Sequence, residues 1–126
     1  MGPSNLVVKV RRAQRAAILD LRGDIDGFSE QALVAAYAEA ERTDPASIVL
    51  NFEQVHYINS TGIALIVDLL AKTQASHRRL LAYGLSDHFV EIFEITRLAD
   101  HVSILADEES AVEAPDQPRG QHQDDT

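Results

Sequence analysis

The 126-residue chain contains no cysteine and no tryptophan, one methionine, four prolines and six glycines. Without cysteine, disulfides, thiolate metal sites and cysteine nucleophiles are excluded. No stretch of the chain approaches the roughly 18 to 20 apolar residues that a membrane-spanning helix needs, so we predict no membrane span. The first residues, 1–6, lack the basic and apolar regions of a secretory signal peptide. We therefore expect a cytoplasmic protein.

Positive charge is also scarce, since the net charge is -9. Seven acids and one base lie from Asp107 onward, which leaves -3 for the rest of the chain. A mildly acidic body without a basic stripe argues against nucleic acid as a partner. A basic cluster near the N-terminus is predicted to be a solvated hairpin end, with contact to an acidic partner as the alternative; it consists of Lys9, Arg11, Arg12 and Arg15.

The remaining pattern predicts alternating strands and helices. Apolar runs indicate strands at 6–10, 17–21, 47–52, 79–83 and 102–105, and helical periodicity indicates helices at 31–41 and 61–74. A third, short helix follows Leu85-Ser86, and 108–113 is expected to add a helical turn. The order β-β-α-β-α-β-α-β predicts one α/β domain over residues 5–113, with a mixed, largely parallel sheet of about five strands and helices packed against it. Residues 114–126 are polar and acidic and are expected to be disordered.

For two of the predicted helices, the sequence also indicates which residues cap the helix and which face the core. In the first, Ser29 is expected to cap the helix, with Phe28 and Leu33 as a hydrophobic staple. Its predicted core face consists of Leu33, Ala36, Tyr37 and Ala40. In the second, the predicted core stripe consists of Ile63, Ile66, Val67 and Leu70. Leu65 and Leu69 lie off this stripe, so we expect them to face solvent or a partner.

The stretch with most chemical content is Asn59-Ser60-Thr61-Gly62, which joins a buried strand to a helix. Ligand sites of α/β folds usually lie at the carboxyl ends of their strands. Hydroxyl groups at a helix N-terminus lie among free backbone N–H groups, where an anion is favoured. On the residues alone, a helix cap with a glycine for close packing explains the same pattern.

The segment around this turn, SIVLNFEQVHYINSTGIALIVDLLAKTQ, resembles the signature of the STAS domain in bacterial anti-sigma factor antagonists. There, a hydrophobic strand leads into an Asp-Ser-Ser/Thr-Gly turn and an apolar helix. Leu21-Arg22-Gly23-Asp24-Ile25-Asp26 is similar to the family's Gly-Glu-Leu-Asp strand end, and residues 85–93 are similar to its third helix. The resemblance covers about residues 5–113 in the same order as the predicted elements.

The resemblance implies a regulatory binding protein and no enzymatic activity. The family's phosphorylated serine falls on Ser60, with Thr61 as the second choice. The family binds an anti-sigma factor that is a serine kinase, and a PP2C-type phosphatase removes the phosphate. The implied partner-binding residues are Asp24, Asp26, Asn59, Ser60, Thr61, Gly62, Leu65 and Leu69. Asn59 stands where the common motif has Asp, which removes a charge next to the hydroxyl while an amide can still cap the helix.

Other readings of the same residues stay open or fail. An accessory STAS subunit of a membrane transporter and a scaffold protomer of a signalling assembly are the alternative functions. Ser60 with His56 lacks the Gly-x-Ser-x-Gly elbow, because Ile58 stands at its first glycine. Asp24 and Asp26 could hold a cation, although two carboxylates are more often a solvated loop. No histidine has metal-ligand spacing and no glycine-rich loop is present, so we predict neither a metal nor a cofactor.

Overall fold

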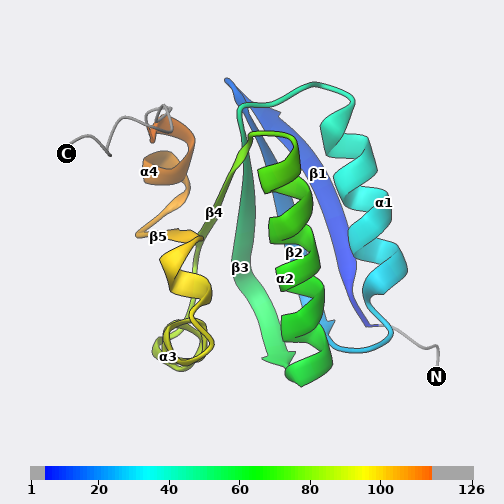
Figure 1. Cartoon of the computed structure of the whole chain (residues 1–126), viewed down its shortest axis with the longest axis vertical. Coiled ribbons are helices and arrows are strands. Elements are labelled where there is room, and N and C mark those ends of the chain that lie inside the picture. The colour runs from blue at the N-terminus through cyan, green and yellow to red at the C-terminus, as the bar shows by residue number, and fades with distance from the viewer. Residues whose placement is uncertain (1–4, 115–126) are drawn as a thin grey trace.

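The computed structural model describes residues 5–114, which form one sheet covered by helices (Figure 1). The strands are β1 (Val7–Ala13), β2 (Ala16–Ile25), β3 (Ser47–Ile58), β4 (Arg79–Tyr83) and β5 (Ser103–Leu105). The helices are α1 (Glu30–Glu41), α2 (Ser60–Ala75), α3 (Asp87–Ile95) and α4 (Glu108–Glu113), with a 3-10 turn, η1 (Leu98–Asp100). The strands follow one another in the order β1-β2-β3-β4-β5. Only the β1–β2 pair in this sheet is antiparallel.

The predicted α/β class, the mixed and largely parallel sheet and the order of the elements are therefore confirmed. The third helix begins as predicted, since the Ser86 hydroxyl accepts a hydrogen bond from the N–H of Phe89 at 3.2 Å. The tail prediction lies outside the described residues, except for Ala114.

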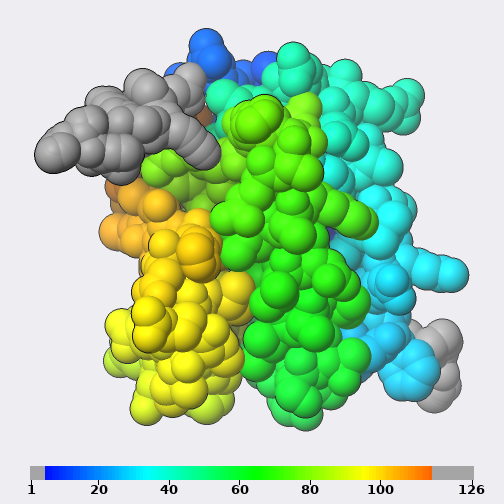
Figure 2. Space-filling model, viewed as in Figure 1, coloured from blue at the N-terminus to red at the C-terminus, as the bar shows by residue number. Residues whose placement is uncertain are grey.

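Neighbouring residues of each strand point to opposite faces of the sheet, so the domain has two apolar clusters. Leu19 and Leu50 belong to the larger cluster, which the helices α1, α2 and α3 cover. Ile18 and Val49 belong to the smaller cluster on the other face, where Ala111 of α4 packs against them. Figure 2 shows α2 lying between α1 on one side and α3 on the other. The three large helices thus share one face, and most of the other face is left to polar side chains.

The predicted core face of α1 is confirmed, with buried Leu33, Ala36, Tyr37 and Ala40. Ser29 is the N-cap residue of α1 as predicted, but the predicted side-chain cap and the staple are wrong. Ser29 is fully buried, and its hydroxyl accepts a hydrogen bond from Asp26 N–H at 2.9 Å and donates to the Asp24 carbonyl at 3.1 Å. That hydroxyl caps no N–H of α1. Phe28 is 65% exposed and cannot staple Leu33. The side chain of Ser29 holds the preceding loop in place of the helix end.

The predicted core stripe of α2 is displaced around the helix. Ile66 and Leu70 are buried as expected, but Val67 is 46% exposed and Leu69 is only 4% exposed. Leu65 is half-buried and packs against the core. The expectation that Leu65 and Leu69 face solvent is therefore wrong. The cause is α1, which lies against that side of α2, since Leu33 and Val34 of α1 line a groove together with Leu65 and Leu69.

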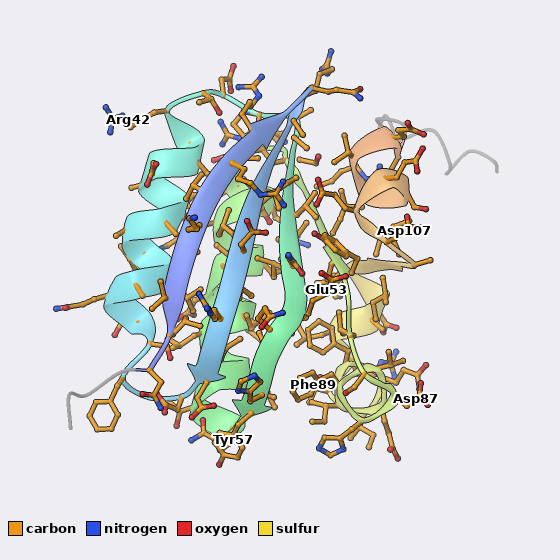
Figure 3. All side chains as sticks on the ribbon, turned by 180° about the vertical axis from the view of Figure 1, so that it is seen from behind. Arg42, Glu53, Tyr57, Asp87, Phe89 and Asp107 are labelled. Carbon is orange, nitrogen blue, oxygen red and sulfur yellow. The ribbon has the colours of Figure 1, made fainter. Side chains whose placement is uncertain are left out.

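β3 is twice as long as predicted, and its register against β2 shifts twice in the added part. Asp20 pairs with Asn51 but Arg22 pairs with Gln54, so β3 contains one residue more than β2 in this interval. A second shift lies between Gly23 and Asp24. Each shift leaves two consecutive exposed residues, first Glu53-Gln54 and then His56-Tyr57, while the next residue returns to the core. Figure 3 shows Glu53 and Tyr57 on this strand from the side without the large helices.

The basic cluster at the hairpin is only partly a solvated end. Arg11 forms ion pairs with Asp20 of β2 at 2.6 Å and with Glu108 of α4 at 2.9 Å. The hydroxyl of Tyr83 donates to the same Glu108 carboxylate at 3.0 Å. Arg11 therefore joins the hairpin to the C-terminal helix. Its neighbour Arg12 donates to backbone carbonyls in the turns at this end of the sheet.

Candidate functional site

Two chain segments meet at the carboxyl ends of β2 and β3. The two strands pair in parallel as far as Ile25 and Ile58, so the β2–α1 loop and the turn before α2 leave the sheet side by side. The N–H of Asn59 donates to the carbonyl of Ile25 at 3.3 Å and ties the two segments together. A position at strand carboxyl ends is where α/β folds usually form a site.

Asn59 begins α2 as its N-cap. Its side-chain oxygen accepts a hydrogen bond from the N–H of Gly62 at 2.9 Å, and its backbone is extended. The predicted amide cap is thus confirmed. The carbonyl of Asn59 accepts from the N–H of Ile63 at 2.9 Å, which closes the first helical turn. Asn59 therefore fixes the orientation of the two hydroxyl residues that follow it.

Ser60 and Thr61 are both exposed at the first two positions of α2. Among the described residues, no partner forms a hydrogen bond with the Ser60 hydroxyl. The methyl group of Thr61 faces the β2–α1 loop, since a Cβ built on Gly27 would lie 3.5 Å from it. The first turn of α2 contains no acidic residue, so no residue of the helix itself offsets the positive end of its dipole. An added anion on Ser60 would therefore be electrostatically tolerated here.

Gly62 allows this turn to lie directly against β2. A Cβ at this position would overlap the carbonyl oxygen of Ile25 and lie 3.0 Å from the side chain of Ile58. No side chain fits without displacement of a backbone segment. Gly62 therefore acts by letting the helix approach the strand closely, as its place in the sequence suggested, and it offers no side chain to a partner.

The two aspartates beside the turn, Asp24 at the end of β2 and Asp26 in the loop that follows, bond to groups of the chain itself. The Asp26 carboxylate accepts a hydrogen bond from the N–H of Phe28 at 2.9 Å, forming an Asx turn. The Asp24 carboxylate accepts from the amide of Asn5 at 3.2 Å. Within residues 5–114, no group of three or more histidine or acidic side chains is arranged to hold a metal ion. Asp24 and Asp26 remain partly exposed beside the turn, and they offer negative charge there.

Six of the eight residues predicted for partner binding are thus brought together: Asp24, Asp26, Asn59, Ser60, Thr61 and Gly62. Leu65 and Leu69 lie farther along α2 and line a groove of about 400 Å³ between α1 and α2, with Leu33 and Val34 on its other side. Two exposed aromatic residues near the site were not predicted, Phe28 in the loop and Tyr57 at the end of β3.

The sequence matches the STAS domain family over residues 7–111. The chain belongs to this family, and its sheet, helices and turn are those of a STAS domain. No helix formed by residues 5–114 is long and apolar enough to cross a membrane.

Individual proteins of known name are also similar to this chain. The chain is similar to the anti-sigma-B factor antagonist of Staphylococcus aureus, with 27% identity over 96 residues that cover 76% of this chain and 89% of the relative. An anti-sigma factor antagonist from Mycobacterium paratuberculosis has the same fold, with a TM-score of 0.71, 18% identity and coverage of 90% of this chain and 96% of that one. The Bacillus protein SpoIIAA in its phosphorylated form has a TM-score of 0.65 and 19% identity, over 85% of this chain and 97% of its own.

Proposed function

We propose that this chain is an anti-sigma factor antagonist that acts by binding and not by catalysis. It binds an anti-sigma factor, itself a serine kinase, and thereby frees a sigma factor. The observation that supports this most is the exposed hydroxyl of Ser60 at the first position of α2, where the family's phosphorylated serine falls. The name of the Staphylococcus aureus relative favours this function over a transporter subunit or a signalling scaffold.

Phosphorylation at Ser60 switches the protein off in this proposal. The N-terminus of a helix tolerates a phosphate, so the domain stays folded when the group is added. Phosphorylation instead weakens binding to the partner. A phosphate brings about -1.5 to -2 charges, which must be desolvated against a partner surface shaped for a hydroxyl. The kinase supplies the ATP, and a PP2C-type phosphatase restores the hydroxyl. The chain needs no cofactor, metal or nucleic acid for this cycle, which we place in the cytoplasm.

The partner contacts the loop and the turn together. Asp24 and Asp26 supply negative charge on one side, and Asn59 and Thr61 supply polar groups around Ser60. Leu65 is accessible only through the groove between α1 and α2, so it can contribute at the edge of the contact. Leu69 lines the same groove but is almost fully buried, so it contributes mainly to the packing of α2.

The first test is capture of the kinase with the purified unphosphorylated chain from native lysate, followed by binding and phosphorylation with the purified pair. Ser60→Asp is expected to keep the wild-type circular dichroism spectrum and melting curve but to bind about a hundredfold more weakly, a loss of about 3 kcal/mol. Ser60→Ala is expected to bind well and to accept no phosphate. Thr61→Ala is the matched control for the phosphate acceptor and is expected to remain a substrate of the kinase. A phosphate located on Thr61 by mass spectrometry would move the switch by one residue.

Asn59 provides the second test. Asn59→Asp keeps a side-chain oxygen for the cap and restores the charge of the common family motif. If the kinase phosphorylates both forms, Asn59 is a neutral replacement within the switch. Phosphorylation of the variant alone, with tight binding by the wild-type chain, would identify a constitutive binder and refute the switch at Ser60.

A further inference from the structure

Phe28 lies outside an aromatic core that contains every other phenylalanine of the chain. Phe52, Phe89 and Phe93 are buried, and Phe52 meets the other two edge-to-face at ring-centroid distances of 6.0 and 5.6 Å. Phe28 is instead 65% exposed in the loop between β2 and α1. Its exposure contributes nothing to the stability of the domain and keeps an apolar ring in water.

Hydrogen bonds hold the backbone of the loop around Phe28. The N–H of Phe28 donates to the Asp26 carboxylate at 2.9 Å, and the N–H of Ser29 donates to the Asp26 carbonyl at 3.0 Å. The fully buried hydroxyl of Ser29 bonds to the backbone of Asp26 and of Asp24. The backbone on both sides of the ring is therefore fixed before any partner arrives. Binding therefore costs little backbone entropy in this loop, and the main entropy loss is the rotamer freedom of the exposed ring.

Phe28 also lies beside the proposed switch. The preceding residue, Gly27, lies next to the methyl group of Thr61, so the loop that presents Phe28 contacts the first turn of α2. Ser60 begins that same turn. A partner that covers Ser60 and this loop together can therefore reach the Phe28 ring as well.

We propose that Phe28 is the apolar anchor of the anti-sigma factor interface and inserts into an apolar pocket of that kinase. This inference rests on the proposed function and adds to it a residue that carries much of the affinity. Large aromatic side chains that become fully desolvated at the centre of an interface dominate binding, and the surrounding contacts mainly exclude water. The phosphate on Ser60 then acts next to the anchor, where its hydration shell opposes closure of the pocket over the ring.

The test measures binding of the full unphosphorylated chain to the purified kinase captured by the wild type. Phe28→Ala is expected to weaken the complex about 30-fold, mainly by faster dissociation, with a melting temperature within about 1 °C of the wild type because the ring is exposed. Val7→Ala is the matched control, since Val7 is 58% exposed on the sheet face away from the large helices. It is expected to leave the affinity unchanged.

A second variant reports burial directly. The chain has no tryptophan, so Phe28→Trp made with fluorotryptophan gives one fluorine signal even when the partner contains unlabelled tryptophan. This variant is expected to bind as the wild type does and to shift its signal when the kinase is added. An unshifted signal in a formed complex would overturn the anchor.

The remaining outcomes separate the two proposals. Wild-type affinity of Phe28→Ala for the kinase overturns the anchor and leaves the proposed function intact. A change in self-association by light scattering, with unchanged kinase affinity, would assign the ring to a second copy of the chain instead. If the wild-type chain binds no such kinase, the proposed function and the anchor fail together.

Discussion

The carboxylate of Glu108 in α4 lies 2.9 Å from the guanidinium of Arg11, a residue 97 positions earlier in the chain. A second contact at 3.2 Å makes the pair bidentate. Arg11 binds Asp20 as well, and Asn51 donates to that carboxylate at 2.8 Å. A helix of six residues has little stability of its own. This network and the apolar contact of Ala111 with the sheet therefore hold α4 in place.

Replacement of Arg11 by methionine is expected to loosen α4. The bidentate pairs are partly exposed, so we expect a loss of about 1 kcal/mol, or about 4 °C in melting temperature. Hydrogen exchange should rise first in the amides of Glu108–Glu113. Lys9→Met is the control, because it removes a cation from the same sheet face but no hydrogen bond to another described residue. Equal losses for both variants would mean that net charge, not the Arg11 contacts, is responsible.

The same network predicts an acid-sensitive contribution to stability. Hydrogen bonds from Arg11 hold the pKa values of Asp20 and Glu108 below their ordinary range, with smaller help from Asn51 and Lys9 for Asp20 and from Tyr83 for Glu108. A carboxylate with a depressed pKa in the folded state stabilises above its unfolded pKa, here about 4. That stability is lost as the pH falls through the lower folded values.

The stability difference between the wild type and Arg11→Met should therefore be full at pH 6 to 7 and shrink below about pH 4. Chemical denaturation of both proteins at a series of pH values measures it. A difference that stays constant down to pH 3 would show that the two carboxylates are not coupled to Arg11.

Gly62 and Gly27 make a matched pair for the packing of the turn. Gly62→Ala places a methyl group on the carbonyl of Ile25 and is expected to cost about 1 to 3 kcal/mol, since a packed segment must move. Gly27→Ala meets only the Thr61 methyl at an ordinary contact distance and should change stability by less than about 0.5 kcal/mol. Denaturant midpoints of the two variants compare them directly. Equal midpoints would contradict the close approach of α2 to β2.

Leu69 and Val67 test which face of α2 is buried. Leu69→Ala removes a core side chain and is expected to cost about 2 to 5 kcal/mol. Val67→Ala trims a side chain that is nearly half exposed and should cost less than about 1 kcal/mol. The reverse order of the two losses in denaturant unfolding would restore the stripe that periodicity alone predicts.

The error on α2 shows where sequence periodicity reaches its limit. Residues 63–70 are apolar at every position except Asp68, so two neighbouring stripes fit a helical period almost equally well. The choice between them depends on α1, which lies against the Leu69 side, and on Gly62, which sets how the helix meets β2. Both depend on the tertiary structure and cannot be read from the sequence of α2. In the short helix α3, charged residues alternate with the apolar ones, so only one buried face fitted the sequence.

The parts of the site that depend on interactions between residues close in sequence could be predicted. The cap by Asn59 and the close approach at Gly62 follow from residue types that have one main use at a helix start. The loop before α1 could not be predicted, because Ser29 has two uses: it can cap a helix or bond within a turn. Burial decided between them, and burial of a serine cannot be read from its neighbours. The exposure of Phe28 follows from that choice.

The two register shifts in β3 give that strand two residues more than the paired part of β2. Each adds one residue to β3, and pairing with β2 resumes immediately afterwards in the shifted register. Deleting one member of Glu53-Gln54 would thus leave Ile58 opposite Ile25 and the following serine in its place beside the loop. A relative could therefore differ from this chain by one or two residues here and keep the same switch geometry. Counting positions back from the serine would then misassign its core, whereas aligning on Ile25 and Gly62 would not.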